Sequence, residues 1–187
     1  FFKVRASWGQ NGNASIDPFQ YLATIAINQK NGYYFGDNKT SLIRGAYPDI
    51  LPNPDIKWET SEQINIGFDA RFVNNKLNLV FDWYKKTTKD WLVQAPVLAI
   101  YGTSAPYING GDVENKGVEF GLNWNDNAGE FSYGVGINGA FNKNKVLRIA
   151  NSEGIIHGAS DVLSQSTKEM YRAQVNYPIG YFYGFQT

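Results

Sequence analysis

The sequence predicts an all-β chain folded as an antiparallel up-and-down meander. Apolar and polar residues alternate along several long runs, which is the period of a strand with two different faces. Aromatic residues make up 16% of the chain and glycines number 19, as is usual for strands joined by turns. Connections between the runs alternate in length, so short turns lie at one end of the strands and long segments at the other. The sequence contains no run of about 18 apolar residues, so it predicts no membrane-spanning helix.

Composition excludes several classes of function. The 17 basic and 17 acidic residues cancel, and without a basic surface we expect no nucleic-acid partner. Cysteine is absent, which excludes disulfide bonds and thiolate metal sites. The sequence contains no metalloprotease, nucleotide-binding or serine-hydrolase motif. We therefore expect no enzyme, no metal and no cofactor.

The chain opens inside an alternating run, FFKVRASWG, which predicts the first strand. The dipeptide Asn11–Gly12 then breaks the pattern. Residues 10 to about 60 contain four prolines, so we expect a long connection that can hold short strands.

A hairpin is predicted over residues 60–93, where two alternating runs flank the pair Asn74–Asn75. The strands cover about Thr60 to Val73 and Lys76 to about Val93. Asn tolerates the positive φ that a two-residue turn requires. Directly opposed residues share a face, and with this turn every apolar residue meets another one. The apolar pairs are Phe72 with Leu77, Ala70 with Leu79, Phe68 with Phe81 and Ile66 with Trp83.

A second hairpin is predicted from GVEFGLNW (residues 117–124) and FSYGVGINGAF (residues 131–141). We expect a turn over residues 126–129 to join them. The opposed pairs are then Trp124 with Phe131, Leu122 with Tyr133 and Phe120 with Val135.

Two more segments are expected to be irregular, over about 94–115 and about 144–176. The second contains the only His of the chain. The last run, YPIGYFYGFQT, predicts that the sequence closes in mid-strand.

Two folds are compatible with this pattern. Short turns at one end and long loops at the other are typical of transmembrane barrels of the outer membrane. Aromatic residues at both ends of the apolar face resemble the girdles that mark membrane–water interfaces. They are Phe72, Trp124 and Phe131 near the short turns, and Trp83 and Trp91 toward the loops. The alternative is a soluble β-sandwich, whose apolar faces meet across a core, and alternation alone does not separate the two.

Several segments resemble, in order, the late barrel region of the SusC/RagA family of TonB-dependent outer-membrane transporters. The longest is LPNPDIKWETSEQINIGFDARFVNNKLNLVFDWYKKTTKDWL, residues 51–92. GGDVENKGVEFGLNW (residues 110–124) and NYPIGYFYGFQT (residues 176–187) are similar to the segments that follow it. VRASWGQNGN, residues 4–13, also fits, so the resemblance covers most of the chain.

The resemblance implies part of a transmembrane β-barrel of about 22 strands in the outer membrane of a Gram-negative bacterium. It implies an importer of oligosaccharides or peptides, energised by the TonB complex through an N-terminal part and working with a SusD-like surface lipoprotein. Residues 1–187 match the C-terminal half of the barrel, and the plug, the TonB-contacting segment and the barrel C-terminus have no counterpart in them. We therefore expect a piece of a longer protein. The alternative function is a soluble extracellular β-sandwich module that binds carbohydrate.

The resemblance also assigns roles to the two faces of the strands. The residues expected to contact outer-membrane lipid are Ile66, Phe68, Leu79, Phe81, Leu122 and Val135. The expected aromatic girdle consists of Phe72, Trp83, Trp124 and Phe131. The residues expected to line the lumen are Asn65, Asp69, Arg71, Asp82, Glu119 and Asn123.

Loop aromatic residues are candidates for contact with substrate or partner, because flat rings stack on sugars and grip peptides at low entropic cost. They are Tyr33, Tyr34, Tyr101 and Tyr107. The competing interpretation is that these rings pack one loop against another or against the lipoprotein.

Two groups invite a catalytic interpretation. Asp69 and Asp82 are diagonal neighbours on the polar face, and paired carboxylates can hydrolyse glycosides. Arg71 shares that face, however, and a lumen wall is normally polar. His157 has only Glu153 near it in the sequence. We expect neither group to be catalytic and His157 to be an ordinary loop residue.

Overall fold

The computed structural model describes residues 1–34, 42–94, 99–159 and 169–184. The chain forms two compact units. The first comprises Phe1–Asn13, Glu59–Trp91 and Gly111–Thr187, and the second comprises Ala14–Trp58 and Leu92–Gly110. Among the described residues, no helix is long and apolar enough to cross a membrane.

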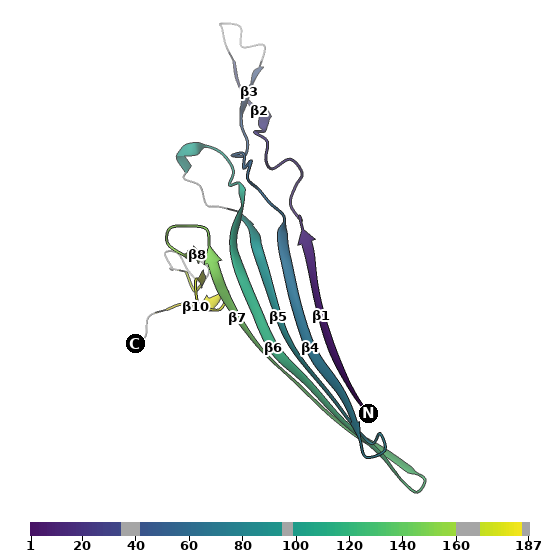
Figure 1. Ribbon diagram of the computed structural model, residues 1–187. Helices are drawn as coiled ribbons and strands as arrows, with labels where there is room; N and C mark the ends of the chain where they lie inside the picture. The colour runs from purple at the N-terminus through teal and green to yellow at the C-terminus, as the bar shows by residue number, and fades with distance from the viewer. Residues whose placement is uncertain (35–41, 95–98, 160–168, 185–187) are drawn as a thin grey trace. The chain divides into compact units, whose positions relative to one another are not determined.

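The first unit contains a five-stranded sheet in the order β1-β4-β5-β6-β7 (Figure 1). Its strands are β1 (Phe2–Asn13), β4 (Glu59–Phe72), β5 (Leu77–Gln94), β6 (Tyr107–Ala128) and β7 (Phe131–Ile149). The pairs β1–β4, β4–β5 and β6–β7 are antiparallel. The predicted all-β antiparallel architecture is therefore confirmed, and this chain leaves the sheet open.

The first hairpin has the register that the sequence predicts. Phe72 lies opposite Leu77 and Phe68 lies opposite Phe81. The turn holds three consecutive residues at positive φ, because Val73 (51°) joins Asn74 (53°) and Asn75 (67°) in the left-handed region. The amide of Lys76 donates to the carbonyl of Val73 at 3.0 Å and closes the turn.

The second hairpin has a different register from the predicted one. β6 continues past Trp124 to Ala128, and the turn lies at Gly129, with a φ of 64°. Trp124 therefore faces Val135 rather than Phe131. By the same shift Leu122 faces Ile137 and Phe120 faces Gly139. The displacement is four residues, an even number, so the alternation that predicted the two faces is the same in both registers.

β6 also begins earlier than predicted. It starts at Tyr107, inside the segment that was expected to be irregular up to about residue 115. β7 likewise runs on to Ile149, beyond the predicted limit near residue 144.

A small three-stranded sheet follows β7, in the order β10-β9-β8. Its strands are β8 (Ile155–His157), β9 (Tyr171–Gln174) and β10 (Tyr181–Phe182). Backbone hydrogen bonds tie this sheet to β7, with Val146 donating to Tyr177 at 2.9 Å and accepting from Asn176 at 2.8 Å. β8 and β9 interrupt the segment predicted to be irregular over about 144–176, whereas β10 lies in the last run, where a strand was predicted.

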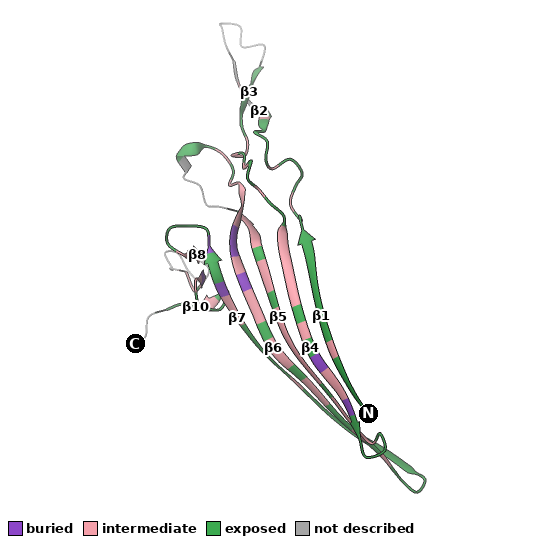
Figure 2. Ribbon diagram, in the orientation of Figure 1, coloured by how far each residue is buried: buried purple, intermediate pink, exposed green. Residues whose placement is uncertain are grey.

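A core of four buried residues joins the small sheet to the long one, formed by Val113, Val146, Ile149 and Ala173. The few buried positions are purple in Figure 2. Trp91 packs against this core, which corrects its predicted place beside Trp83 on the apolar face. The physical reason is the positive φ of Asp90 (54°), which interrupts the alternation of β5 just before Trp91.

The second unit contains short strands, as the sequence analysis allowed for the long connection over residues 10 to about 60. β2 (Ile25–Tyr34) pairs with β3 (Leu42–Pro48), with a register shift between Ile27 and Gly32. A 3₁₀ turn, η1, covers Ala99–Tyr101. The side-chain amide of Asn53 donates to the carbonyl of Tyr107 at 2.8 Å and links the two segments of the unit.

Candidate functional site

One face of the five-stranded sheet is apolar over the part nearest the short turns, and we call it the apolar face. A row of rings crosses it, with centroids 5.6 Å apart between Phe2 and Phe68 and 5.5 Å apart between Phe68 and Phe81. Ile66 and Leu79 share the face because each lies two residues from a ring of this row. Four of the predicted lipid-facing residues are therefore together.

The apolar face continues onto β6 and β7. Lys85 alternates with the apolar residues of β5 and forms an ion pair of 2.9 Å with Glu114 of β6. Glu114 in turn alternates with Leu122 and Trp124 along β6. Trp124 lies directly opposite Val135. The remaining predicted lipid-facing residues, Leu122 and Val135, thus lie on the same face.

Large side chains on the apolar face are exposed. Exposed fractions are 51% for Phe72, 68% for Phe131, 61% for Val135 and 68% for Phe141. Among the described residues, the buried apolar side chains are Ala70 and the four that form the small core. A β-sandwich would bury this face against a second sheet, and the described part of the chain forms no such layer.

The opposite face is polar, and an ion triad crosses three strands on it. Arg5 of β1 donates through Nε and Nη2 to the carboxylate of Asp69 at 3.1 Å for both bonds. Its Nη2 also donates to Asp82 of β5 at 2.9 Å. Gly67 lies between Arg5 and Asp82 in the same cross-strand row. A Cβ on Gly67 would lie 2.2 Å from a carboxylate oxygen of Asp82, so the glycine gives this contact its space.

The triad gives a structural partner to the two carboxylates that invited a catalytic interpretation. Both Asp69 and Asp82 accept hydrogen bonds from Arg5, a residue that the sequence analysis did not single out. Arg71, which was expected to be the relevant cation, instead lies over the ring of Phe1 at 5.4 Å. The sequence analysis did not pair β1 with β4. It therefore gave no sign that Arg5 lies opposite Gly67, in the same cross-strand row as Asp82.

The other predicted lumen residues also lie on the polar face. Asn65 accepts a hydrogen bond from Gln63 at 3.0 Å and donates to Ser7 at 3.4 Å. An open hollow of about 590 Å³ is lined mainly by Lys3, Asp69, Arg71, Asn78, Asn123 and Asn125. A second hollow, of about 420 Å³, is bordered by Asp82, Glu119 and Asn138. The face is therefore polar and hollowed, as a wall in contact with water would be.

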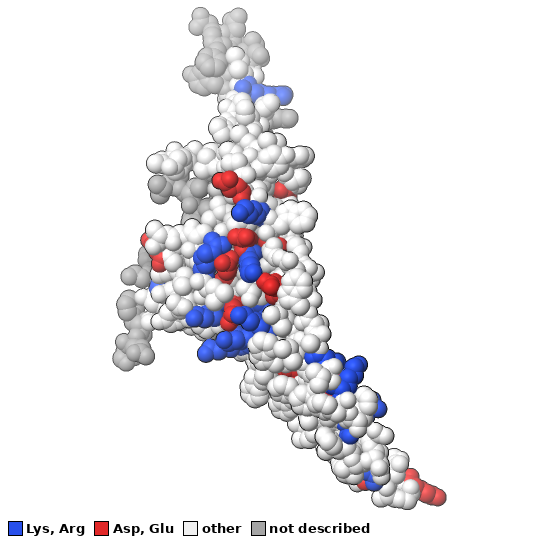
Figure 3. All heavy atoms as spheres, viewed as in Figure 1, with Lys and Arg blue, Asp and Glu red and all other residues white. Residues whose placement is uncertain are grey.

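Beyond the apolar rows, the apolar face becomes charged, and we call this region the charged belt. It consists of Glu62, Lys85, Lys89, Asp90, Asp112, Glu114, Lys116, Lys143, Lys145 and Arg148. Lys89 pairs with Glu62 at 2.8 Å, and Arg148 pairs with Asp112 at 2.8 Å. Figure 3 shows charged side chains gathered over the upper part of the long strands, with mostly uncharged surface below, apart from a basic patch at one edge and a few charged side chains at the lower tip.

The predicted loop contacts fall in the second unit. Tyr101 is 59% exposed in η1, and Tyr107 is half-buried at the start of β6. Tyr33 and Tyr34 belong to β2, and their side chains lie outside the part of the structure that is described.

An aromatic hollow in the second unit was missed by the sequence analysis. It has a volume of about 260 Å³ and is bordered by Ile16, Phe19, Tyr21, Ile56 and Trp58 among others. The rings of Phe19 and Tyr21 have centroids 6.3 Å apart, and Trp58 is 70% exposed. Residues 16–21 and 56–58 are distant in the sequence, so periodicity gives no signal for this hollow.

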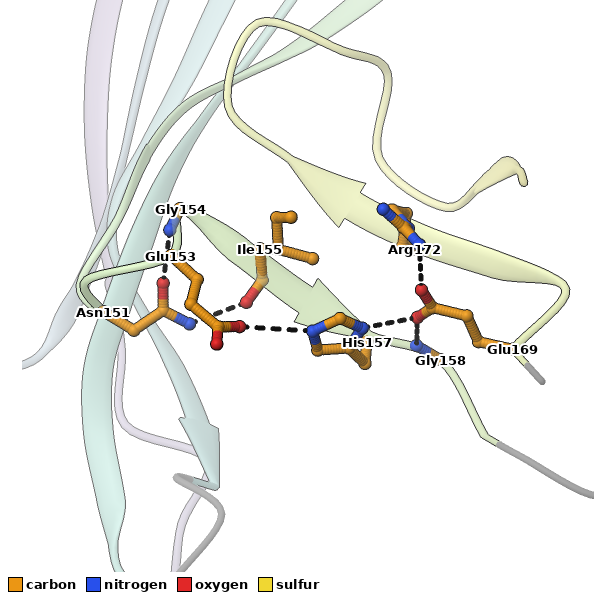
Figure 4. A network of polar contacts seen from close by, with 8 residues as sticks. All are labelled: Asn151, Glu153, Gly154, Ile155, His157, Gly158, Glu169 and Arg172. Atoms are coloured by element: carbon orange, nitrogen blue, oxygen red, sulfur yellow. Dashed lines mark hydrogen bonds and ion pairs between the residues drawn. The ribbon is translucent and has the colours of Figure 1, made fainter. Parts of the chain in front are cut away.

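His157 in the small sheet has more partners than the sequence indicated (Figure 4). Its Nδ1 lies 2.8 Å from Glu169 and its Nε2 lies 3.3 Å from Glu153. Hydrogen bonds to Glu153 and to Glu169 raise the pKa of His157 above its ordinary value of 6.5. Glu169 also accepts from Arg172, whose guanidinium lies over the ring of Tyr183. Within the described ranges, no group of three His, Asp or Glu side chains could hold a metal ion.

Comparison with known families matches residues 1–186 to the family described as TonB dependent receptor-like, beta-barrel. A relative named TonB-dependent receptor P3, from Formosa agariphila, is 33% identical over 99% of this chain. The protein named TonB-dependent receptor SusC, from Bacteroides thetaiotaomicron, is 29% identical over 98% of it. The chain spans 18% and 19% of those two relatives.

Solved structures give the same fold. The structure titled RagAB peptide transporter superposes with a TM-score of 0.76 and 22% identity over 97% of this chain. The RagAB peptide importer in an open-open state superposes with a TM-score of 0.72 and 23% identity over 95%. In each case 18% of the neighbour's chain is covered. The open sheet described above therefore has the fold of part of a closed barrel wall.

Proposed function

The chain belongs to the TonB-dependent receptor-like β-barrel family, and we propose that it forms part of the wall of an outer-membrane importer. The apolar face contacts the hydrocarbon of the outer membrane. The polar face lines the lumen. Long connections lie on the outer side and the short turns on the periplasmic side, which is the usual orientation of such barrels.

The observation that carries this proposal is an uncharged band on the apolar face of β6 and β7, bounded by polar rows. One row is Asp126 opposite Tyr133, and the other is Lys116 opposite Lys143. At about 3.3 Å per residue, the strands advance about 33 Å between the rows. A tilt of about 40° makes this a height of about 25 Å, which is the height of the apolar band of such barrels.

The wall acts passively in transport. Its polar face supplies a hydrated surface, on which Arg5 bridges Asp69 and Asp82. The polar face also holds a plug. Energy enters from the TonB complex through an N-terminal part of the longer protein, and the outer loops meet a SusD-like surface lipoprotein.

We propose oligosaccharides or peptides as the substrate class. The neighbouring RagAB structures are titled as a peptide transporter and as a peptide importer, which supports the second class. On this chain, Tyr101 and Tyr107 remain candidate contacts, and the aromatic hollow bordered by Trp58 is a further one, because it offers exposed rings for stacking.

Two adjacent residues of β6 on opposite faces give a matched test in the full-length protein. Leu122 lies on the apolar face and Asn123 on the polar face. Leu122→Arg places a charge in hydrocarbon, which costs about 2–4 kcal/mol near mid-membrane. We expect a strong loss of folded protein from the outer membrane for Leu122→Arg and near-normal assembly for Asn123→Arg, measured by surface labelling and heat-modifiable electrophoresis.

Equal assembly of the two variants would contradict the lipid-facing assignment. So would a full-length protein that folds cooperatively as a soluble monomer without detergent, because a lipid-facing surface of this size would then be in water.

A further inference from the structure

Two lysines oppose each other directly on the apolar face, at the edge of the uncharged band. Lys116 of β6 and Lys143 of β7 are cross-strand partners, and both are exposed. Like charges in directly opposed positions destabilise a strand pair. The pair therefore has an electrostatic cost in this chain that an anion placed between the two ammonium groups would remove.

Nearby carboxylates do not balance these charges. Glu114 lies 3.4 Å from Lys116, but it already pairs with Lys85 at 2.9 Å. Lys145, the cross-strand partner of Glu114, adds a third positive charge beside that one carboxylate. Among the residues that the structure describes, neither Lys143 nor Lys145 has an ion-pair partner. This group of four, Lys85, Lys116, Lys143 and Lys145, is the lysine cluster.

The surface directly below the lysine cluster is apolar and exposed. The next row toward the short turns is Val118 opposite Phe141, and Phe141 is 68% exposed. Ile137 on the same face is 59% exposed. A ligand that fits both parts has an anionic head and apolar chains.

We propose that Lys116 and Lys143 bind the phosphate headgroup of a lipid in the outer leaflet, with its acyl chains lying against Phe141 and Ile137. The proposal rests on the membrane orientation given under the proposed function. In that orientation the lysine cluster lies at the level of the headgroups, about 25 Å above the Asp126 row. Lysines near an anionic lipid surface are each attracted to it, and paired ammonium groups suit a phosphate.

The test uses the full-length protein purified in detergent and reconstituted into nanodiscs. Two double variants remove the same charge, Lys116→Gln with Lys143→Gln on the apolar face, and Lys3→Gln with Lys86→Gln on the polar face. Retention of a phosphate-bearing lipid, relative to a neutral lipid with the same chains, is measured by native mass spectrometry. We expect about thirtyfold weaker retention for the first double variant and no change for the second. Replacing both Lys116 and Lys143 by Arg should restore retention.

Three results would overturn the proposal. The first is equal retention of the phosphate-bearing lipid in the two double variants. The second is equal retention of the neutral and the phosphate-bearing lipid by the unmodified protein. The third is complete displacement of the lipid by millimolar inorganic phosphate, which would show a phosphate site without a lipid contribution. Outer-membrane assembly of the unmodified protein is measured in parallel. If that protein assembles while retention is unchanged by the variants, the lipid site alone is wrong; if it does not enter the membrane, the proposed function is wrong.

Discussion

Arg5 on β1 reaches across the full width of β4 and donates to Asp82 on β5 at 2.9 Å. The residue that it crosses is Gly67, which lies opposite both of them. These hydrogen bonds cross-link three strands, because the guanidinium also holds Asp69 on the middle strand.

The first prediction concerns the glycine beneath this cross-link. In Gly67→Ala the new Cβ would meet Asp82 at 2.2 Å and the carbonyl oxygen of Phe81 at 2.6 Å. We expect the contact between Arg5 and Asp82 to be lost and the free energy of unfolding to fall by about 1–3 kcal/mol, because Gly67 is buried and the added methyl group overpacks the site. Thermal unfolding of the full-length protein in detergent measures the change.

Gly121→Ala provides the control for this substitution. Gly121 also lies in a long strand, but a Cβ there has no atom within 4 Å. We expect its thermal transition to match that of the unmodified protein. If the thermal transition of Gly67→Ala also matched that of the unmodified protein, the cross-link would not depend on the space above Gly67.

The second prediction concerns the turn between β4 and β5. Val73 is 57% exposed and has a φ of 51°, a conformation that costs a β-branched residue free energy. Val73→Gly should therefore stabilise the folded protein by about 0.5–1 kcal/mol, because relief of the left-handed conformation exceeds the entropy that glycine adds to the unfolded chain.

Denaturant midpoints of full-length Val73→Gly and Val80→Gly provide the comparison. Val80 is exposed within β5, where glycine weakens a strand, so its substitution should destabilise. Two shifts of the same sign would show that the turn does not strain Val73.

The third prediction concerns the pH dependence of the small sheet. Both ring nitrogens of His157 lie against carboxylates, those of Glu153 and Glu169, and only the doubly protonated ring donates to both. The folded-state pKa of His157 is raised by these contacts above 6.5. The stabilisation is therefore fully present below about pH 6.5 and is lost as the pH rises through the raised value.

Hydrogen-exchange protection of the β8 and β9 amides, corrected for intrinsic exchange, should decrease between about pH 6 and pH 9. His157→Gln removes the titrating group while Arg172 keeps its contact with Glu169, so its protection should be lower at acid pH and flat across this range. A decrease of the same size in the variant would assign the pH dependence to another group.

Much of the long sheet was accessible from local pattern. Period-two alternation identified the two faces, and a turn that Asn74 and Asn75 can adopt specified the register of the first hairpin. The second hairpin was displaced by four residues because polar residues near Asp126 were interpreted as a turn, whereas they continue β6. Lys76 pairs with Asp126 at 2.6 Å, which shows why a strand can be polar there.

The sequence by itself determined the fold class, the residues of each face and the resemblance to the family, because these depend on alternation and on contiguous motifs. Tertiary structure alone decided which charges meet. Arg5 and Asp82 lie 77 residues apart in the chain, and Lys116 opposes Lys143 only in the register that β6 and β7 adopt. Alternation specifies the side of a sheet on which a residue lies, whereas strand pairing specifies the residue beside it.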